Sequence, residues 1–294
     1  MVEWRVNMNY KEIKKNDILL FDGAMGTMIK SYGLNINNSI ESYNFTEEEK
    51  IKRIHREYIK AGADVITTNT FGANKIRFKN DKYDIEEIII KGIKIAKEAR
   101  EGNDKILLAY DIGPTGVGVK PVGTLTFNEA YEIFKKQIVI AVENEVDLIL
   151  IETILNLEEC KAAIKSAKDC SNLPVFCTFT LNGEGKLFDG NSIENAIKEV
   201  DKLDIEAIGI NCSPGAKDIH IIIEKIKKLT EKDIMVQPNT RCYINNLKTF
   251  IEISENEFSE EILKCIEKGA TIIGGCCGTT PRYINKIKEK LNQL

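Results

Sequence analysis

The hydrophobic positions of this 294-residue chain fall in short apolar runs that are separated by longer amphipathic segments. The runs are rich in β-branched residues and apolar at consecutive positions, which is typical of strands buried on both faces of a parallel sheet. Eight runs are predicted as strands: 18–21, 64–69, 106–111, 147–152, 175–180, 207–211, 234–238 and 271–275.

The amphipathic segments carry helix signals at their starts. Two Thr-x-x-Glu capping boxes and two cap residues followed by proline mark expected helix starts. These are Thr46 with Glu49, Thr126 with Glu129, Ser213 with Pro214, and Thr280 with Pro281. A final helix is expected over 282–291.

Strands that alternate with helices along the whole chain predict an α/β fold. No shift in composition, Ser/Pro-rich linker or low-complexity segment divides the sequence, so a single domain over 1–294 is expected, with 1–16 as an N-terminal extension. We predict a closed (β/α)8 TIM barrel, with a doubly wound open sheet as the alternative. In such a barrel the active site lies at the carboxyl ends of the strands.

Composition narrows the class of partner. The formal net charge is −4 and the basic residues are dispersed, which excludes the basic patch typical of a nucleic-acid binder. The longest apolar runs are too short to span a bilayer, and the N-terminus lacks the apolar core of a secretory signal. The eight cysteines are therefore expected to be reduced thiols or metal ligands in a cytoplasmic enzyme with a small-molecule substrate.

Polar and thiol side chains stand where the predicted strands end, and a barrel brings such side chains to one rim. The candidates are Asp22, Asn69, Thr70, Asp111, Glu152, Thr178, Thr180, Asn211, Cys212, Asn239, Cys276 and Cys277. Catalytic zinc takes three protein ligands, often thiolates, and leaves one position open. A zinc site formed by the three cysteines is therefore one interpretation, and the glycines around the adjacent pair would allow the tight turn that it needs.

Other interpretations of the segment GGCCGTTP remain open on the residues alone: a phosphate loop, a vicinal disulfide or plain packing. A phosphate loop would leave the two adjacent thiols unexplained. Cys160, Cys170, Cys177 and Cys265 are interpreted as small core hydrophobes.

Three acidic residues at the strand ends are candidates for binding or catalysis. Asp22 could be a general base, a ligand for a substrate amine or a turn residue. Glu152 ends an apolar strand, where an unpaired carboxylate is costly, so a cationic partner is expected: a substrate or a neighbouring Lys or Arg. Asp111 precedes Gly-Pro and could simply initiate a loop.

The motifs DGAMGTM, TNTFGAN, GPTG, IET, GINCS and GGCCGTTP, in this order from residue 22 to 281, resemble the homocysteine S-methyltransferase family. The likeness is greatest to the homocysteine-binding domain of cobalamin-dependent methionine synthase. The resemblance implies a (β/α)8 barrel with zinc held by Cys212, Cys276 and Cys277. It also implies a homocysteine site at Asp22, Gly23, Thr70, Glu152 and Asn239, with Thr70 lining the pocket.

One segment departs from the family pattern. Where the family usually has Pro-Asn-Ala-Gly, this chain has Pro238 and Asn239 followed by Thr240, Arg241 and Cys242. The bulkier, charged and thiol side chains are expected to reshape the amino-acid pocket or the acceptor preference.

The mechanism that the resemblance implies agrees with elementary thiol chemistry. A free thiol is only a few per cent ionised at neutral pH, so binding it to zinc as thiolate offsets a free-energy cost of ionisation of roughly 2 kcal/mol.

The chain ends soon after the cysteine pair, so we expect the methyl donor to come from a separate molecule. A methylated corrinoid protein carrying methylcobalamin is favoured, and a sulfonium or betaine-like donor is the alternative. A non-catalytic module that binds homocysteine or a corrinoid protein, and a phosphate-binding barrel enzyme, are competing hypotheses.

Overall fold

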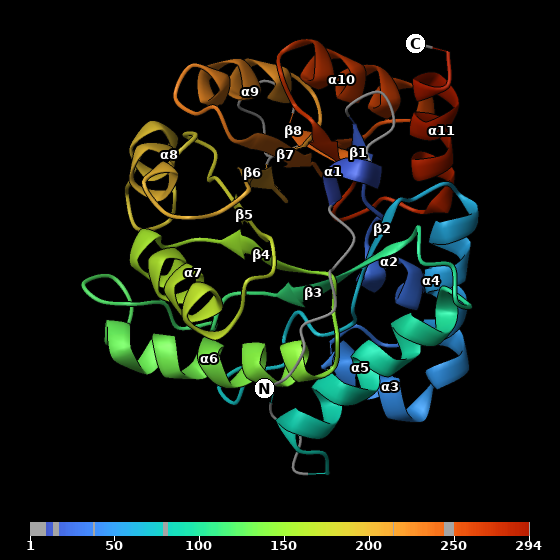
Figure 1. Ribbon diagram of the computed structural model, residues 1–294. Coiled ribbons are helices and arrows are strands. Elements are labelled where there is room, and N and C mark those ends of the chain that lie inside the picture. The colour runs from blue at the N-terminus through green and yellow to red at the C-terminus, as the bar shows by residue number, and fades with distance from the viewer. Residues whose placement is uncertain are drawn as a thin grey trace.

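Eight parallel strands form a single sheet at the centre of the molecule, surrounded by helices (Figure 1). The computed structural model describes residues 10–13, 18–37, 39–78, 82–213, 215–243 and 250–293. The strands are β1 (Leu19–Leu20), β2 (Val65–Thr67), β3 (Leu107–Ile112), β4 (Leu148–Ile154), β5 (Val175–Phe179), β6 (Ala207–Asn211), β7 (Asp233–Gln237) and β10 (Ile272–Ile273). Each lies within or overlaps a run predicted from the hydrophobic pattern.

The sheet closes into a barrel. Its order is β1-β10-β7-β6-β5-β4-β3-β2, and a parallel bridge between Phe21 and Val65 joins the two outer strands. Across this seam Asp64 donates its backbone N–H to the carbonyl of Leu20 at 2.7 Å. The predicted (β/α)8 barrel is therefore confirmed, and the open doubly wound sheet is excluded.

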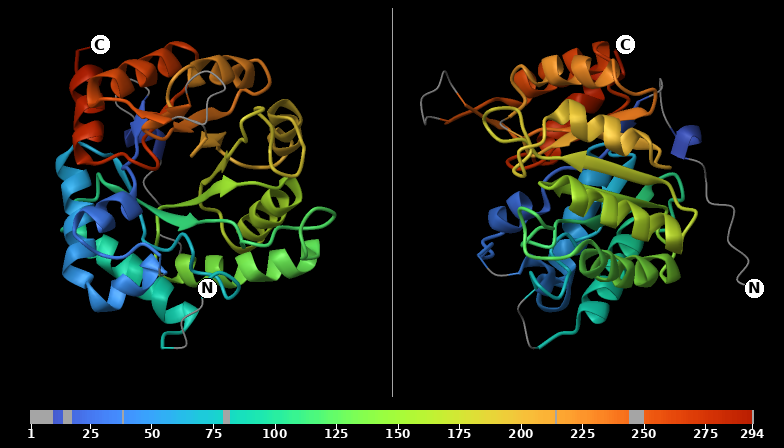
Figure 2. Two further views of the ribbon diagram at one scale, coloured as in Figure 1. Left: turned by 180° about the vertical axis from the view of Figure 1, so that it is seen from behind. Right: turned by 90° about the vertical axis from the view of Figure 1, so that its left-hand side faces the viewer.

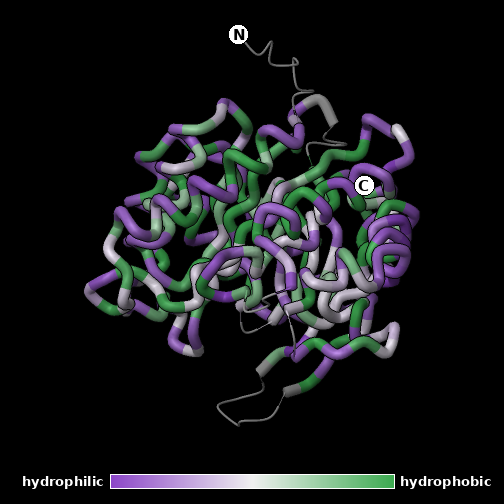
Figure 3. The backbone as a smooth tube through the Cα atoms, turned by 90° about the horizontal axis from the view of Figure 1, so that it is seen from below, coloured by the Kyte–Doolittle hydropathy of each residue, from purple (hydrophilic) through white to green (hydrophobic). Residues whose placement is uncertain are grey.

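The helices form the outer layer. They are α1 (Tyr10–Ile13), α2 (Met25–Ser31), η1 (Ile40–Ser42), α3 (Tyr43–Thr46), α4 (Glu48–Lys60), α5 (Ile85–Ala99), α6 (Phe127–Glu143), α7 (Leu157–Cys170), α8 (Ile193–Asp201), α9 (Ile219–Lys227), α10 (Glu255–Glu267) and α11 (Pro281–Leu291). In Figure 3 the outer helices alternate between hydrophilic and hydrophobic residues along their length, as expected when one side packs on a sheet. In the described part of the chain, no helix combines the length and apolar character needed to cross a membrane.

Two of the four predicted helix starts are confirmed. Thr126 and Glu129 form the capping box of α6, and Thr280 is the N-cap of α11 with proline in its first turn. The predicted start at Thr46 is wrong, because Thr46 ends α3 and α4 begins at Glu48 without a side-chain cap.

The predicted start at Ser213 is also wrong, and its partner Pro214 lies outside the described residues. Helix α9 begins at Ile219 with Asp218 as its N-cap. The Ser213 hydroxyl instead donates to the Asn211 carbonyl at 3.1 Å and accepts the backbone N–H of Leu181. Ser213 therefore organises the loop after β6 instead of capping a helix.

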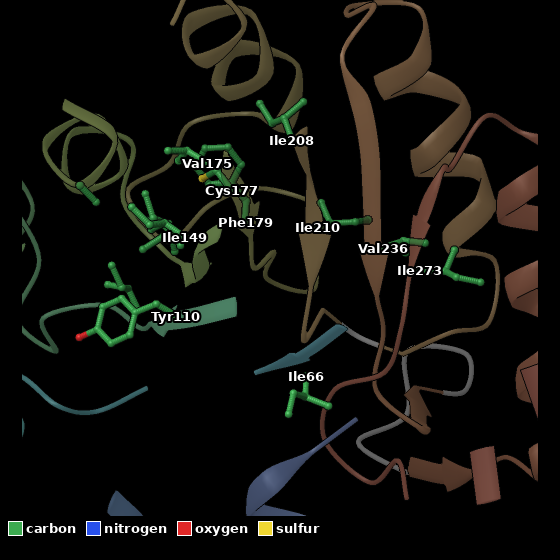
Figure 4. Close-up of a cluster of buried hydrophobic side chains, with 14 of the residues drawn as sticks. Ile66, Tyr110, Ile149, Val175, Cys177, Phe179, Ile208, Ile210, Val236 and Ile273 are labelled. Carbon is green, nitrogen blue, oxygen red and sulfur yellow. The ribbon is translucent and has the colours of Figure 1, made fainter. Parts of the chain in front are cut away.

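Alternating strand residues supply two separate cores. Along β3, Leu107 and Ala109 belong to the cluster inside the barrel, whereas Leu108 and Tyr110 belong to the larger cluster between strands and helices. Figure 4 shows part of the larger cluster, with side chains from β2 through β7 and from β10. This alternation decides which strand-end residues point into the barrel.

The two ends of the barrel differ. Figure 2 shows α1 and the β8–β9 hairpin (Arg241–Tyr243 and Phe250–Glu252) at opposite ends. Tyr10 of α1, within the predicted N-terminal extension, packs edge-on against Phe176 and donates its hydroxyl to Asp233 at 2.8 Å. The end nearer the N-terminus is thus partly covered by an aromatic side chain, and the carboxyl ends of the strands lie at the other end.

Candidate active site at the carboxyl ends of the strands

Three thiols from two separated loops meet at the carboxyl end of the barrel. Cys212 follows β6 directly, and Cys276 and Cys277 follow β10. Their three Sγ atoms lie within 4.8 Å of one another, and those of Cys212 and Cys277 are 3.7 Å apart. Tetrahedral zinc with Zn–S bonds of about 2.3 Å requires sulfur atoms about 3.8 Å apart. The arrangement therefore fits a zinc ion with little adjustment.

The backbone is strained so that Cys212 can face this cluster. Asn211 follows the inward-facing residues of β6, so regular alternation would turn the next side chain outward. Cys212 instead has φ of +48°, a left-handed conformation that costs a non-glycine residue about 1–2 kcal/mol. A bond from its backbone N–H to the Gln237 carbonyl, at 3.0 Å, holds this conformation.

The loop that carries the cysteine pair is equally confined. Cys276 donates its backbone N–H to the Pro238 carbonyl at 2.9 Å, and its own carbonyl accepts the Thr279 hydroxyl at 2.6 Å. Gly278 has φ of +90°, and a Cβ there would lie 1.9 Å from Thr240 Oγ1. Only glycine fits this close approach, as the sequence led us to expect for the turn around the pair.

The thiols are electrostatically coupled. Hydrogen bonds from Cys212 and Cys276 lower the pKa of Cys277 to about 3, whereas hydrogen bonds to its two neighbours raise the pKa of Cys276 well above the ordinary range. Without a cation, this arrangement favours one thiolate, at Cys277, beside two thiols. A divalent cation would supply the charge that three thiolates need, so the chemistry of the donor set fits zinc.

A cavity of about 410 Å³ opens beside the thiols. Its lining includes all three cysteines, the carboxyl groups of Asp22, Asp111 and Glu152, and the backbone from 22 to 26. Asp111 and Glu152 face inward because they continue the inner residues of β3 and β4, Leu107-Ala109 and Leu148-Leu150. Strand alternation therefore gives this rim a dense cluster of acidic groups.

Burial controls the protonation of these carboxyl groups. Asp22 is 2% exposed, and burial raises its pKa to about 8, although the backbone N–H and hydroxyl of Thr67 bond to it. Burial and the nearby Cys277 raise the pKa of Glu152 to about 7, opposed by a 2.9 Å bond from the Asn211 amide. Burial and the charges of Glu152 and Asp22 raise the pKa of Asp111 well above its usual range. A cationic group entering the cavity would restore the ionised forms.

The predicted substrate residues do not all reach the cavity. Asp22, Gly23 and Glu152 line it, but Thr70 and Asn239 do not. Thr70 is fully buried beneath the rim and donates its hydroxyl to the Asp111 carbonyl at 2.8 Å. Asn239 donates its side-chain amide to the Cys212 carbonyl at 3.1 Å. In this geometry both residues support lining residues, and the expectation that Thr70 lines the pocket does not match its position.

The segment that departs from the family pattern also lies outside the cavity lining. The Thr240 side chain packs against Gly278, and its backbone N–H donates to the Cys277 carbonyl at 3.0 Å. Arg241 and Cys242 belong to β8, which pairs with β9 in a hairpin that the sequence did not reveal. Thr240 thus packs against the loop of the cysteine pair, whereas Arg241 and Cys242 lie against Gly215 in the loop after β6, so any influence on the acceptor acts through these two loops.

Several lining residues were missed by the sequence reasoning. Gln237 is 3% exposed and continues the inner face of β7, so alternation from Met235 was the available signal. Phe71 and Arg77 come from the long loop after β2. No local pattern places a loop residue against a cavity, so these two could not have been found from the sequence.

The fold is a TIM barrel, and three converging thiols lie beside an acidic cavity at its carboxyl rim, which is where enzymes of this fold have their active sites. Comparison with known proteins identifies the family. The homocysteine S-methyltransferase family model matches residues 19–291. The chain belongs to the homocysteine S-methyltransferase family and is an enzyme of that family.

Curated relatives and solved structures agree with this assignment. Homocysteine S-methyltransferase 1 of Arabidopsis thaliana is 30% identical, with 92% of this chain and 93% of the relative covered. Methionine synthase of Mycobacterium tuberculosis is 28% identical over 94% of this chain, which spans only 25% of that protein. The metallated form of the homocysteine methyltransferase MmuM from Escherichia coli has the same fold, with a TM-score of 0.81, 24% identity and coverage of 94% and 97%.

Proposed function

We propose that this enzyme transfers a methyl group to the thiolate of homocysteine, bound at a zinc ion held by Cys212, Cys276 and Cys277, and so forms methionine. The observation that carries the proposal is the convergence of the three Sγ atoms within 4.8 Å at the edge of the acidic cavity. Zinc bound there would keep the substrate sulfur as a nucleophilic thiolate at neutral pH. Membership of an enzyme family disfavours the hypothesis of a non-catalytic module.

The residues around the cavity position the amino acid. Glu152 and Asp22 hold the substrate ammonium, which returns each raised pKa toward its ordinary value because a cation stabilises the carboxylate. Gly23 lines the cavity where no side chain fits, since a Cβ there would lie 2.7 Å from Thr279 Oγ1. Fixing the ammonium beside the cysteine cluster orients the substrate sulfur for in-line attack on the methyl group.

Asn211 positions Glu152 for this role. Its side-chain Nδ2 donates to Glu152 Oε2 at 2.9 Å and to Thr153 Oγ1 at 2.8 Å, and its side-chain Oδ1 accepts the Thr153 backbone N–H at 3.0 Å. Thr153 has a positive φ of 59°, so these bonds also fix a strained backbone next to Glu152. Asn211 directly precedes Cys212 and thereby connects Glu152 to the cysteine site.

Asn211→Ala is expected to raise the KM for homocysteine more than it lowers kcat, with zinc content unchanged. Each lost bond to a charged or buried group costs about 1.5–3 kcal/mol, so kcat/KM should fall roughly 10- to 100-fold. Steady-state kinetics with metal analysis test this. Asn211→Asp, which keeps the shape but sets a second carboxylate against Glu152, should be at least as impaired, and an unchanged KM in both variants would contradict the positioning role.

The donor is proposed to be a methylated corrinoid on a separate protein, because the motifs resemble those of cobalamin-dependent methionine synthase. The acidic cavity supports one alternative, a small cationic donor of the sulfonium or betaine type, because Asp22, Asp111 and Glu152 favour a positive charge. The cluster of reduced thiols further suggests a reducing compartment such as the cytoplasm.

A donor panel tests the proposed function. Zinc-loaded enzyme and homocysteine are incubated with methylcobalamin, a methylated corrinoid protein, S-methylmethionine or glycine betaine, and methionine is measured. We expect methionine with the corrinoid donors, and turnover with S-methylmethionine or betaine alone would select the alternative. Absence of methionine with every donor, from protein that holds one equivalent of zinc, would contradict the proposal.

A further inference from the structure

One positively charged side chain, that of Arg77, is among the described residues that line the cavity. Among the described residues that line it, Arg77 is the only cationic side chain, and it shares the cavity with the acidic groups of Asp22, Asp111 and Glu152. Carboxyl groups suit an ammonium, but they repel the carboxylate that an amino acid carries on the same carbon. A substrate with both charges therefore needs a cationic contact as well.

Arg77 is held in place by its surroundings. Its Cζ lies 4.6 Å from the centre of the Phe71 ring, a cation–π arrangement. The ring itself is confined, because a Cβ on Gly113 would lie 2.6 Å from Phe71 Cε2. Asn74 Oδ1 accepts the backbone N–H groups of Ile76 and Arg77 at 3.1 and 2.9 Å, which fixes the loop. The guanidinium is thus preorganised although it is exposed.

The hydrogen-bonding capacity of this guanidinium is unused. Within the described residues, Arg77 forms neither an ion pair nor a side-chain hydrogen bond. Its charge nevertheless lowers the pKa of Asp111, acting against burial and neighbouring acids, which places it near the acidic wall. A guanidinium has five N–H donors in a planar fork that matches a carboxylate.

We propose that Arg77, stacked on Phe71, binds the carboxylate of a substrate in the cavity and so selects for amino acids. This inference rests on the proposed function. With ammonium at Glu152 and Asp22 and carboxylate at Arg77, the side-chain sulfur of the acceptor is the third point of attachment, at the cysteine site. The carboxylate belongs to the thiol acceptor or to a carboxylate-bearing donor, and the experiment separates the two.

The first arm measures binding of two thiols to zinc-loaded protein by calorimetry: homocysteine and 3-aminopropane-1-thiol, which lacks the carboxylate. Arg77→Met should weaken homocysteine binding roughly 10- to 100-fold and change binding of the truncated thiol less than about threefold. Arg77→Lys, which keeps the charge but loses the planar fork, should fall between Arg77→Met and the wild type. Arg56→Met, which removes an exposed arginine that pairs with Glu101 and does not line the cavity, is the matched control.

The second arm measures the KM of two methyl donors at saturating homocysteine. S-methylmethionine carries a carboxylate, and trimethylsulfonium does not. A loss confined to the carboxylate-bearing donor, with homocysteine binding unchanged, assigns the carboxylate to the donor. Equal losses for homocysteine and the truncated thiol, or no change with any ligand, would overturn the role of Arg77. A wild type that binds neither thiol would overturn both this inference and the proposed function, whereas normal wild-type binding with an unaffected Arg77→Met overturns the inference alone.

Discussion

Cys277→Ala is expected to abolish stoichiometric zinc binding and, with it, methyl transfer to homocysteine. Structural zinc sites with four protein ligands hold the metal with about 10–16 kcal/mol, or about 3 kcal/mol per ligand, so the loss of one of the three thiolates should weaken zinc binding roughly 10²- to 10³-fold. The other two proposed ligands, Cys212 and Cys276, should stay in place because the backbone bonds to Gln237 and Pro238 do not depend on the Cys277 side chain. Metal analysis after dialysis against a weak chelator, followed by the methionine assay, measures both effects.

The matched control for this variant is Cys170→Ala, which removes a half-buried thiol at the end of α7 outside the cavity lining. It should keep one equivalent of zinc and near wild-type activity. Full zinc occupancy in Cys277→Ala would show that the three sulfurs do not act as a ligand set. Equal zinc loss in the control would point to general damage instead.

Glu152→Gln is expected to lower kcat/KM for homocysteine roughly 10²- to 10⁴-fold, because breaking one partner of a buried charge pair costs about 3–5 kcal/mol. Glutamine keeps the shape and can still accept the Asn211 amide, so the loss reports the charge. Zinc content should not change. Steady-state kinetics across pH provide a second readout.

The sign of the pH effect follows from the raised pKa of Glu152, about 7. The ionised carboxylate binds the substrate ammonium, so kcat/KM of the wild type should rise as pH increases through about 7, and this limb should disappear in Glu152→Gln. Glu159→Gln is the control: Glu159 is also buried, accepts the N–H and hydroxyl of Thr115, and lies outside the cavity beside the cysteines. A similar loss in both variants would contradict a specific role for Glu152.

The fold was largely predictable because burial on both faces of a parallel strand leaves an unambiguous run of apolar residues. Caps were predictable where the side chain bonds within its own turn, as at Thr126 and Glu129. The same reasoning failed at Thr46 and Ser213, where competing contacts decide the local structure. Thr46 ends a preceding helix, and the Ser213 hydroxyl is used by the carbonyl of Asn211.

Parts of the candidate site were predictable for the same reason. Asp111 and Glu152 lie two residues beyond inner core residues of their strands, so alternation alone places them inside the rim. Thr70 stands past the end of β2, where alternation no longer applies, and it is buried under Asp111. The position of Arg77 depends on how the loop after β2 packs against Phe71 and Gly113, which no local pattern encodes.

By itself, the sequence determined the strands, the single barrel and the residue types at its carboxyl rim, because hydrophobic burial and strand alternation act over a few neighbouring residues. Only the tertiary structure decided that Cys212 turns inward against this alternation, at φ of +48°, to meet Cys276 and Cys277. The physical reason is that the bond holding this strained backbone comes from Gln237, on the adjacent strand β7. Contacts between segments so distant in the chain leave no periodic trace in the sequence.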